Sequence, residues 1–210
     1  MENLRRLCSA SLRQDWPVYL VVTGVFGLGI LLGSVGVNSL PADQVHELHR
    51  YMQSFLSRAA EMEVDQVMLA RQALNDNLLA GLIIYILGMT IICLPLVLAF
   101  IFIRGSVLGF TMGFLAAERE LQGWFVILLS LLPHNAIYIP ALIIGGTASM
   151  SFSILMLKRF YNSRVRVWPG FVGYTMIMAF VTFLLLIAAL VEAYITPELI
   201  RFSASFLAGW

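Results

Sequence analysis

An apolar run of 37 residues, from residue 121 to residue 157, contains no Asp, Glu, Lys or Arg. A straight helix of that length would measure about 55 Å, nearly twice the roughly 30 Å thickness of the hydrocarbon core of a bilayer. The chain as a whole is suited to a membrane, since 60% of its residues are hydrophobic and 12% are charged, against about 45–50% and about 25% in soluble domains. Nucleic-acid-binding proteins often carry a stripe of Lys and Arg with interleaved aromatic residues. The chain has no such stripe outside its short connections, so no nucleic-acid partner is expected.

Two prolines interrupt the long run, and they flank a polar pair. Pro133 and Pro140 each remove a backbone donor and disfavour helical geometry in the residue before them, and His134 and Asn135 lie between them. Freed backbone groups inside a bilayer must be satisfied within the protein. We therefore predict a helix break over residues 133–140, with the two polar side chains bonding the freed groups or those of a neighbouring helix.

The remaining apolar segments complete a predicted all-α, polytopic membrane bundle of about five spans. The first 16 residues carry Arg5, Arg6 and Arg13, and the segment 158–168 carries four basic residues, so the positive-inside rule places both in the cytoplasm. Residues 38–77 hold six acids and three arginines and are expected outside, as is the C-terminal tail. The predicted order is a tail 1–16, spans 17–37, 78–103, 105–117 (short) and 121–157 (two-part), a basic loop 158–168, a span 171–195 and a tail 196–210.

Residues 41–77 are predicted to form a long extracytoplasmic amphipathic helix. Its apolar stripe follows a helical spacing of three and four residues and includes Val45, Leu48, Met52, Phe55 and Met62. This stripe could pack on the spans, lie on the outer leaflet or meet another chain.

Glycines recur at intervals of four in two predicted spans. Gly29 and Gly33 form one pair, and Gly105, Gly109 and Gly113 form a longer series. Small residues at this spacing allow close approach of helices in lipid, which fits either packing within one chain or a homodimer interface.

His134 is the most distinctive candidate for a functional residue, because ionisable groups inside a membrane usually mark function. It could relay protons, bind a metal or hydrogen-bond a backbone group. His46 and His49 share a helix face, but no further ligand cluster accompanies them, and zinc takes four ligands. The chain has no zinc-protease, nucleophile-elbow or phosphate-loop motif. No cofactor, metal or enzymatic activity is expected.

The segment LPHNAIYIPALIIGG, residues 132–146, resembles the signature of the stage II sporulation protein M family, and the likeness extends over nearly the whole chain. The broad family shows His-Gly, then Glu three residues on and Pro two further. His134 and Pro140 match this pattern, whereas Asn135 replaces the Gly and Tyr138 replaces the Glu.

The resemblance implies a non-enzymatic membrane anchor in endospore engulfment, located in the mother-cell and septal membrane. Its implied partners are a peptidoglycan amidase (stage II sporulation protein P) and a lytic transglycosylase (stage II sporulation protein D), besides the lipid bilayer. A transporter-like or channel-like protein with a site at the broken helix is the alternative. A charged partner for His134 would favour the alternative, and Glu192, expected near the outer end, is not predicted to supply one.

Overall fold

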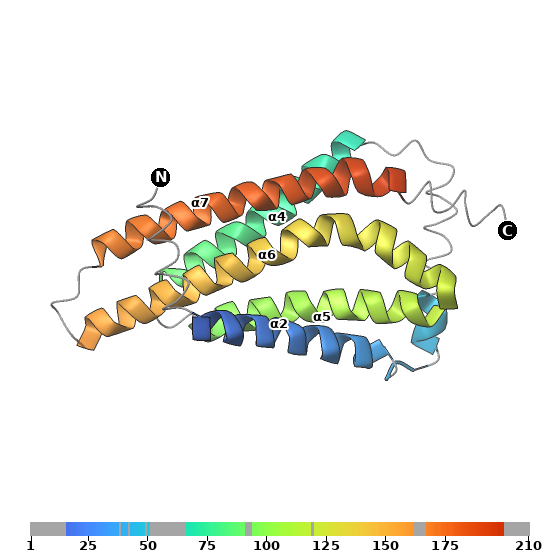
Figure 1. The fold of residues 1–210 in the computed structure, drawn as a ribbon. Coiled ribbons are helices and arrows are strands. Elements are labelled where there is room, and N and C mark those ends of the chain that lie inside the picture. Colours follow the sequence, from blue (N-terminus) through green and yellow to red (C-terminus); the bar gives the residue numbers. More distant parts are fainter. Residues whose placement is uncertain are drawn as a thin grey trace.

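The chain is described by a computed structural model over residues 16–37, 39–41, 43–48, 50, 66–90, 94–118, 120–161 and 167–199. Its labelled elements are α2 (Trp16–Val37), α4 (Gln66–Gly88), α5 (Leu94–Glu118), α6 (Glu120–Tyr161), α7 (Trp168–Leu190) and the π-helix η2 (Val191–Ile195) (Figure 1). Four helical stretches are long and apolar enough to cross a membrane: Trp16–Val37, Leu94–Phe114, Leu131–Tyr161 and Trp168–Leu199. The predicted helical membrane bundle is confirmed.

Prolines mark where three of these helices begin. Pro17, Pro95 and Pro169 each occupy the second residue of α2, α5 and α7. N–H groups in the first turn of a helix have no hydrogen-bond partner within the helix, so proline loses nothing there by lacking one. The fixed φ of proline also favours helix initiation. These prolines therefore define the N-terminal ends of three apolar helices that carry few polar boundary residues.

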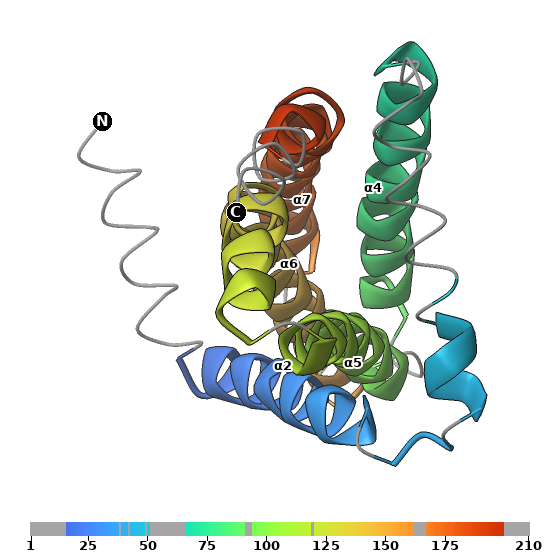
Figure 2. The ribbon, with the colours of Figure 1, turned by 90° about the vertical axis from the view of Figure 1, so that its right-hand side faces the viewer.

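Successive helices run in alternating directions along the bundle (Figure 1). One end, called here the α6–α7 end, holds the starts of α2, α5 and α7 and the last turns of α4 and α6. The opposite end, called the α5–α6 end, holds the last turns of α2 and α5 and the starts of α4 and α6. In the view turned by 90°, α2 and α5 lie together, α6 and α7 lie next to them, and α4 stands beside α7 (Figure 2).

Helix α6 is the centre of the bundle and contacts α2, α4, α5 and α7. Its inward face includes small residues that allow close packing. Ala141, Ser149 and Ser153 are fully buried, and a Cβ added at Gly146 would overlap the Ile101 side chain of α5. The core around it includes Val22, Phe26, Ile84, Val97, Leu142, Met178, Val181 and Leu185.

The glycine series join α2 to α5 within the chain. An added Cβ at Gly29 would lie 2.5 Å from the Phe102 carbonyl oxygen, and one at Gly105 would lie 2.5 Å from the Phe26 carbonyl oxygen. At Gly33 and Gly109 the added Cβ would overlap the opposing backbone, and at Gly113 it would come within 3.0 Å of Ser34. Of the two roles predicted for these glycines, the structure shows packing within one chain, which leaves this stripe unavailable to a second copy.

The predicted break at residues 133–140 is wrong. Helix α6 is continuous from Glu120 to Tyr161 with Pro133 and Pro140 inside it, and it curves instead of breaking (Figure 1). A proline removes only its own N–H and displaces one carbonyl in the preceding turn, and neighbouring side chains and helices can satisfy the freed groups.

Two predicted span boundaries are also wrong. The expected span 78–103 is divided by a turn after Gly88, and the expected short span 105–117 is part of α5, which runs without interruption through Arg104. The turn was missed because its residues are as apolar as those of the helices. Arg104 therefore lies near the middle of a helix and does not mark the end of a span.

The predicted external helix 41–77 does not end at residue 77. Residues 66–77 belong to α4, which continues to Gly88. Residues 43–48 are helical, with Val45 and Leu48 partly exposed. Met52, Phe55 and Met62 lie outside the described residues.

Candidate functional site

His134 of α6 reaches the C-terminal part of α7. Its Nδ1 lies 3.0 Å from the backbone oxygen of Ala188 and 3.4 Å from Oε2 of Glu192. A carbonyl oxygen only accepts hydrogen bonds, so Nδ1 carries the hydrogen and donates it. His134 thus bonds a backbone group of a neighbouring helix, which is one of the two arrangements the sequence predicted.

Glu192 is the charged partner that the sequence did not predict for His134. It belongs to η2, where Thr196 N–H donates to the Val191 carbonyl five residues earlier. Single π-turns inside α-helices are rare and frequently occur at functional sites. The Glu192 side chain is 46% exposed and that of His134 is 16% exposed. The contact between them therefore runs from the bundle interior to its surface. Position 138, where the resemblance described above would place an acid, is a tyrosine, and the acid beside His134 comes from another helix.

Tyr138 extends this contact toward α5. Its ring stacks on the His134 ring with centroids 5.2 Å apart. The side chain is only 7% exposed, and its hydroxyl has no hydrogen-bond partner in the described part of the chain. A buried hydroxyl without a partner is costly.

Arg104 completes a row of four side chains. Its guanidinium carbon lies 6.0 Å from the Tyr138 ring centroid and 5.4 Å from that of Phe100. Such distances allow cation–π attraction, which stabilises an arginine away from water. Arg104, Tyr138, His134 and Glu192, called here the polar row, come from α5, α6 and η2. A charge midway along a span is costly and is by default a sign of function.

Asn135 does not join the polar row. Its Nδ2 donates to the Leu131 carbonyl at 2.8 Å, one turn earlier in α6. This bond stays within α6, next to Pro133. Asn77 of α4, not singled out from the sequence, is 5% exposed, and its amide nitrogen has no partner among the described residues.

A second polar group, also missed from the sequence, closes the C-terminal end of α4. Every one of the last four carbonyls of a helix lacks an intrahelical donor. Here Tyr85 O accepts from the Tyr174 hydroxyl at 2.8 Å and Gly88 O accepts from Ser153 Oγ at 2.9 Å. The carbonyls between them accept from the N–H groups of Met89 and Thr90. All four carbonyls are satisfied, and two of the donors come from α6 and α7.

These caps explain why α4 can end inside an apolar segment. Ser149 and Ser153 are four residues apart on one face of α6, and Ser149 Oγ also donates to Ile84 O at 3.1 Å. The spacing of these two serines was the available sequence signal. Gly88 has no room for a side chain, because an added Cβ would overlap Ser149 Oγ and the Tyr174 hydroxyl.

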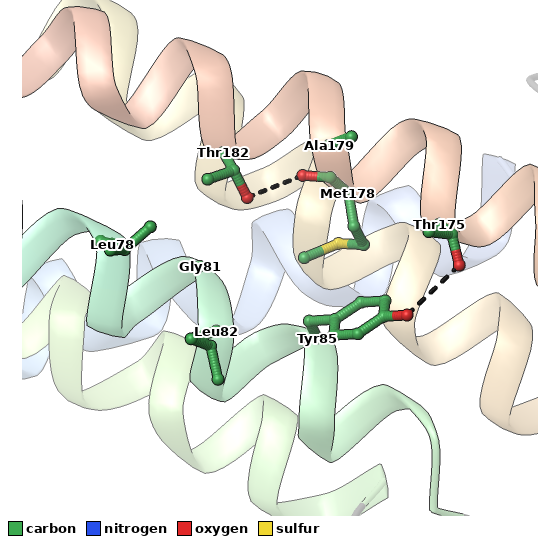
Figure 3. Close-up of a pocket in the computed structure, with 8 residues that line it drawn as sticks. All are labelled: Leu78, Gly81, Leu82, Tyr85, Thr175, Met178, Ala179 and Thr182. Atoms are coloured by element: carbon green, nitrogen blue, oxygen red, sulfur yellow. Dashed lines mark hydrogen bonds between the residues drawn. The ribbon is translucent and has the colours of Figure 1, made fainter.

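An open pocket of about 300 Å³ lies between α4 and α7 (Figure 3). At one end of the pocket, the Tyr85 hydroxyl and Thr175 Oγ1 form a 3.3 Å hydrogen bond. Gly81, which has no side chain, also lines the pocket. Its lining has no charged side chain and lies apart from the polar row.

No group of three or more His, Cys, Asp and Glu residues that could hold a metal occurs in the described ranges. His46 is exposed, and His49 lies outside the described residues.

The chain matches the family described as Stage II sporulation protein M over residues 22–197, which is most of its length. No curated protein and no solved structure matches it.

Proposed function

The chain belongs to the stage II sporulation protein M family, and we propose that it is a multi-pass, non-enzymatic anchor of endospore engulfment. In this role it holds a peptidoglycan amidase (stage II sporulation protein P) and a lytic transglycosylase (stage II sporulation protein D) at the mother-cell and septal membrane. The family match over residues 22–197 is the observation that carries the proposal.

The orientation of the anchor follows from its charges. Lys158 and Arg159 lie in the last turn of α6, and Arg164 and Arg166 follow in the sequence. The positive-inside rule places this α6–α7 end in the cytoplasm. Val37 and Leu199, where the first and last helices end, are then at the opposite end of the bundle, toward the cell wall.

Such an arrangement suits an anchor, because the segments with access to wall enzymes share one end of the bundle. The connection between α2 and α4 carries the predicted apolar stripe, and Val45 and Leu48 at its start are partly exposed. We propose that this stripe contacts the wall enzymes.

Co-purification from sporulating cells in mild detergent tests the anchor. We expect both wall enzymes to elute with the tagged chain and to be lost with Phe55→Glu, which places a charge in the stripe. Gln53→Glu adds the same charge off the stripe and should retain them. Absence of both enzymes from the unsubstituted, folded chain would refute the anchor, and equal retention by the two variants would refute the role of the stripe.

A second candidate function, a transporter-like site, is favoured by one observation: Glu192 lies 3.4 Å from His134 within the polar row. Proton relays in membranes use acid and histidine chains of this kind. Proteoliposomes containing a pH-sensitive dye would measure it. Proton or ion flux that Glu192→Gln abolishes would support this candidate, whereas flux no higher than in empty liposomes would eliminate it.

A further inference from the structure

We propose that a groove at the α6–α7 end binds one anionic phospholipid, with an acyl chain in the groove and the lipid phosphate at Lys158. The groove has a volume of about 470 Å³, within the range of ligand pockets. Three helices form its walls: Ala148 to Lys158 of α6, Gly170 to Ile177 of α7, and Pro17 and Val18 at the start of α2.

Gly173 lines the groove and leaves open space in it. A Cβ added there would meet no atom within 4 Å, whereas one added at Gly170 would overlap the Leu155 side chain. The other lining residues are mainly apolar and include Phe152, Ile154 and Leu155. This surface suits a hydrocarbon chain, which gains by filling a concave apolar surface without losing hydrogen bonds.

The length of the groove matches one leaflet of a bilayer. Its lining along α6 runs from Ala148 to Lys158, which is about 15 Å at the helical rise of 1.5 Å per residue. The hydrocarbon core of a bilayer is roughly 30 Å thick, so one leaflet is about half of that.

Aromatic side chains indicate the level of the lipid headgroups at this end. Trp16, Tyr161 and Trp168 are 60%, 83% and 75% exposed, and all three lie at the α6–α7 end. Exposed Trp and Tyr gather at the membrane–water interface. Lys158 is also exposed and lies one turn before Tyr161, so its ammonium group is at the depth of the lipid phosphates.

Charge identifies an anionic lipid as the occupant. Lys158 is the charged residue of the groove lining, which contains no acid, and basic residues between helices at an interface bind anionic headgroups. The chain's own first 15 residues are a poorer match, because Arg5, Arg6 and Arg13 outnumber Glu2 and Asp15 and would not neutralise the lysine.

Native mass spectrometry of the purified full chain, released from nanodiscs of equal phosphatidylglycerol and phosphatidylcholine content, tests the proposal. The unsubstituted chain should retain one phospholipid, mainly phosphatidylglycerol. Gly173→Leu fills the groove without meeting another atom at Cβ and should lose it. Gly24→Leu is the matched control, because Gly24 is exposed and an added Cβ there also meets nothing within 4 Å.

Lys158→Gln separates the headgroup contact from the apolar contact. It should lower the preference for phosphatidylglycerol about fivefold, since one basic residue near an anionic surface contributes about 1 kcal/mol, while one lipid is still retained. Equal lipid retention by Gly173→Leu and Gly24→Leu would overturn the proposal. So would a preference unchanged by Lys158→Gln, or an unsubstituted chain without lipid, as expected if a protein segment fills the groove.

Discussion

Ser153→Ala should destabilise the bundle more than Ser149→Ala, although the two substitutions remove the same atom from the same face of α6. Both serines are fully buried. Ser149 donates to Ile84 O, a carbonyl inside α4 that also receives the N–H four residues later. Ser153 donates to Gly88 O, which is the last carbonyl of α4 and has no intrahelical donor.

The magnitude follows from what each substitution leaves unpaired. A buried polar group without a partner costs about 1–3 kcal/mol, and hydrogen bonds between membrane helices average about 0.6 kcal/mol with a maximum of about 1.7. We expect a loss of about 1–1.5 kcal/mol in the free energy of unfolding for Ser153→Ala, near the upper limit, because the Gly88 carbonyl loses its donor. Ser149→Ala should cost about 0.5 kcal/mol or less, because the Ile84 carbonyl keeps its helical donor.

Reversible unfolding in mixtures of SDS and a mild detergent, followed by circular dichroism, would measure both values. Tyr174→Phe provides a third variant, because it removes the donor to Tyr85 O but preserves the ring that stacks on Phe152. It should resemble Ser153→Ala. Equal effects of the two serine substitutions would refute the argument that α6 and α7 cap the end of α4.

Three further outcomes are expected. Gly109→Ala should lower the thermal stability of the folded chain, because its Cβ would overlap the Ile30 backbone, whereas Gly27→Ala, with open space around it, should not; equal melting temperatures would show that α2 and α5 need no close contact. His134→Ala should cost roughly 1–3 kcal/mol by leaving a polar group unpaired, and His134→Gln should retain part of the bond; normal stability of both with engulfment abolished would instead indicate site chemistry. A cysteine at Ser163 in a cysteine-free chain should not react with an impermeant thiol reagent in intact cells, and labelling there would refute the cytoplasmic position of the basic loop.

The sequence alone determined the class of the protein, because apolar length and composition depend only on local residues. The runs around α2 and α7 were located closely, since each is apolar throughout and bounded by polar or basic segments. The likeness of residues 132–146 to a family signature also required no structure. The glycine spacing predicted close packing, because a four-residue repeat places all members on one helix face.

Tertiary structure decided what each of these features contacts. Helix α4 ends in an apolar stretch because its carbonyls are capped by Ser153 and Tyr174, which lie far along the chain and leave no mark near Gly88. Contacts between distant segments likewise place Glu192 beside His134 and Arg104 beside Tyr138, although the sequence had placed both charged residues at the ends of spans. Helix α6 stays continuous through Pro133 and Pro140, which the two prolines and the length of the apolar run had not predicted.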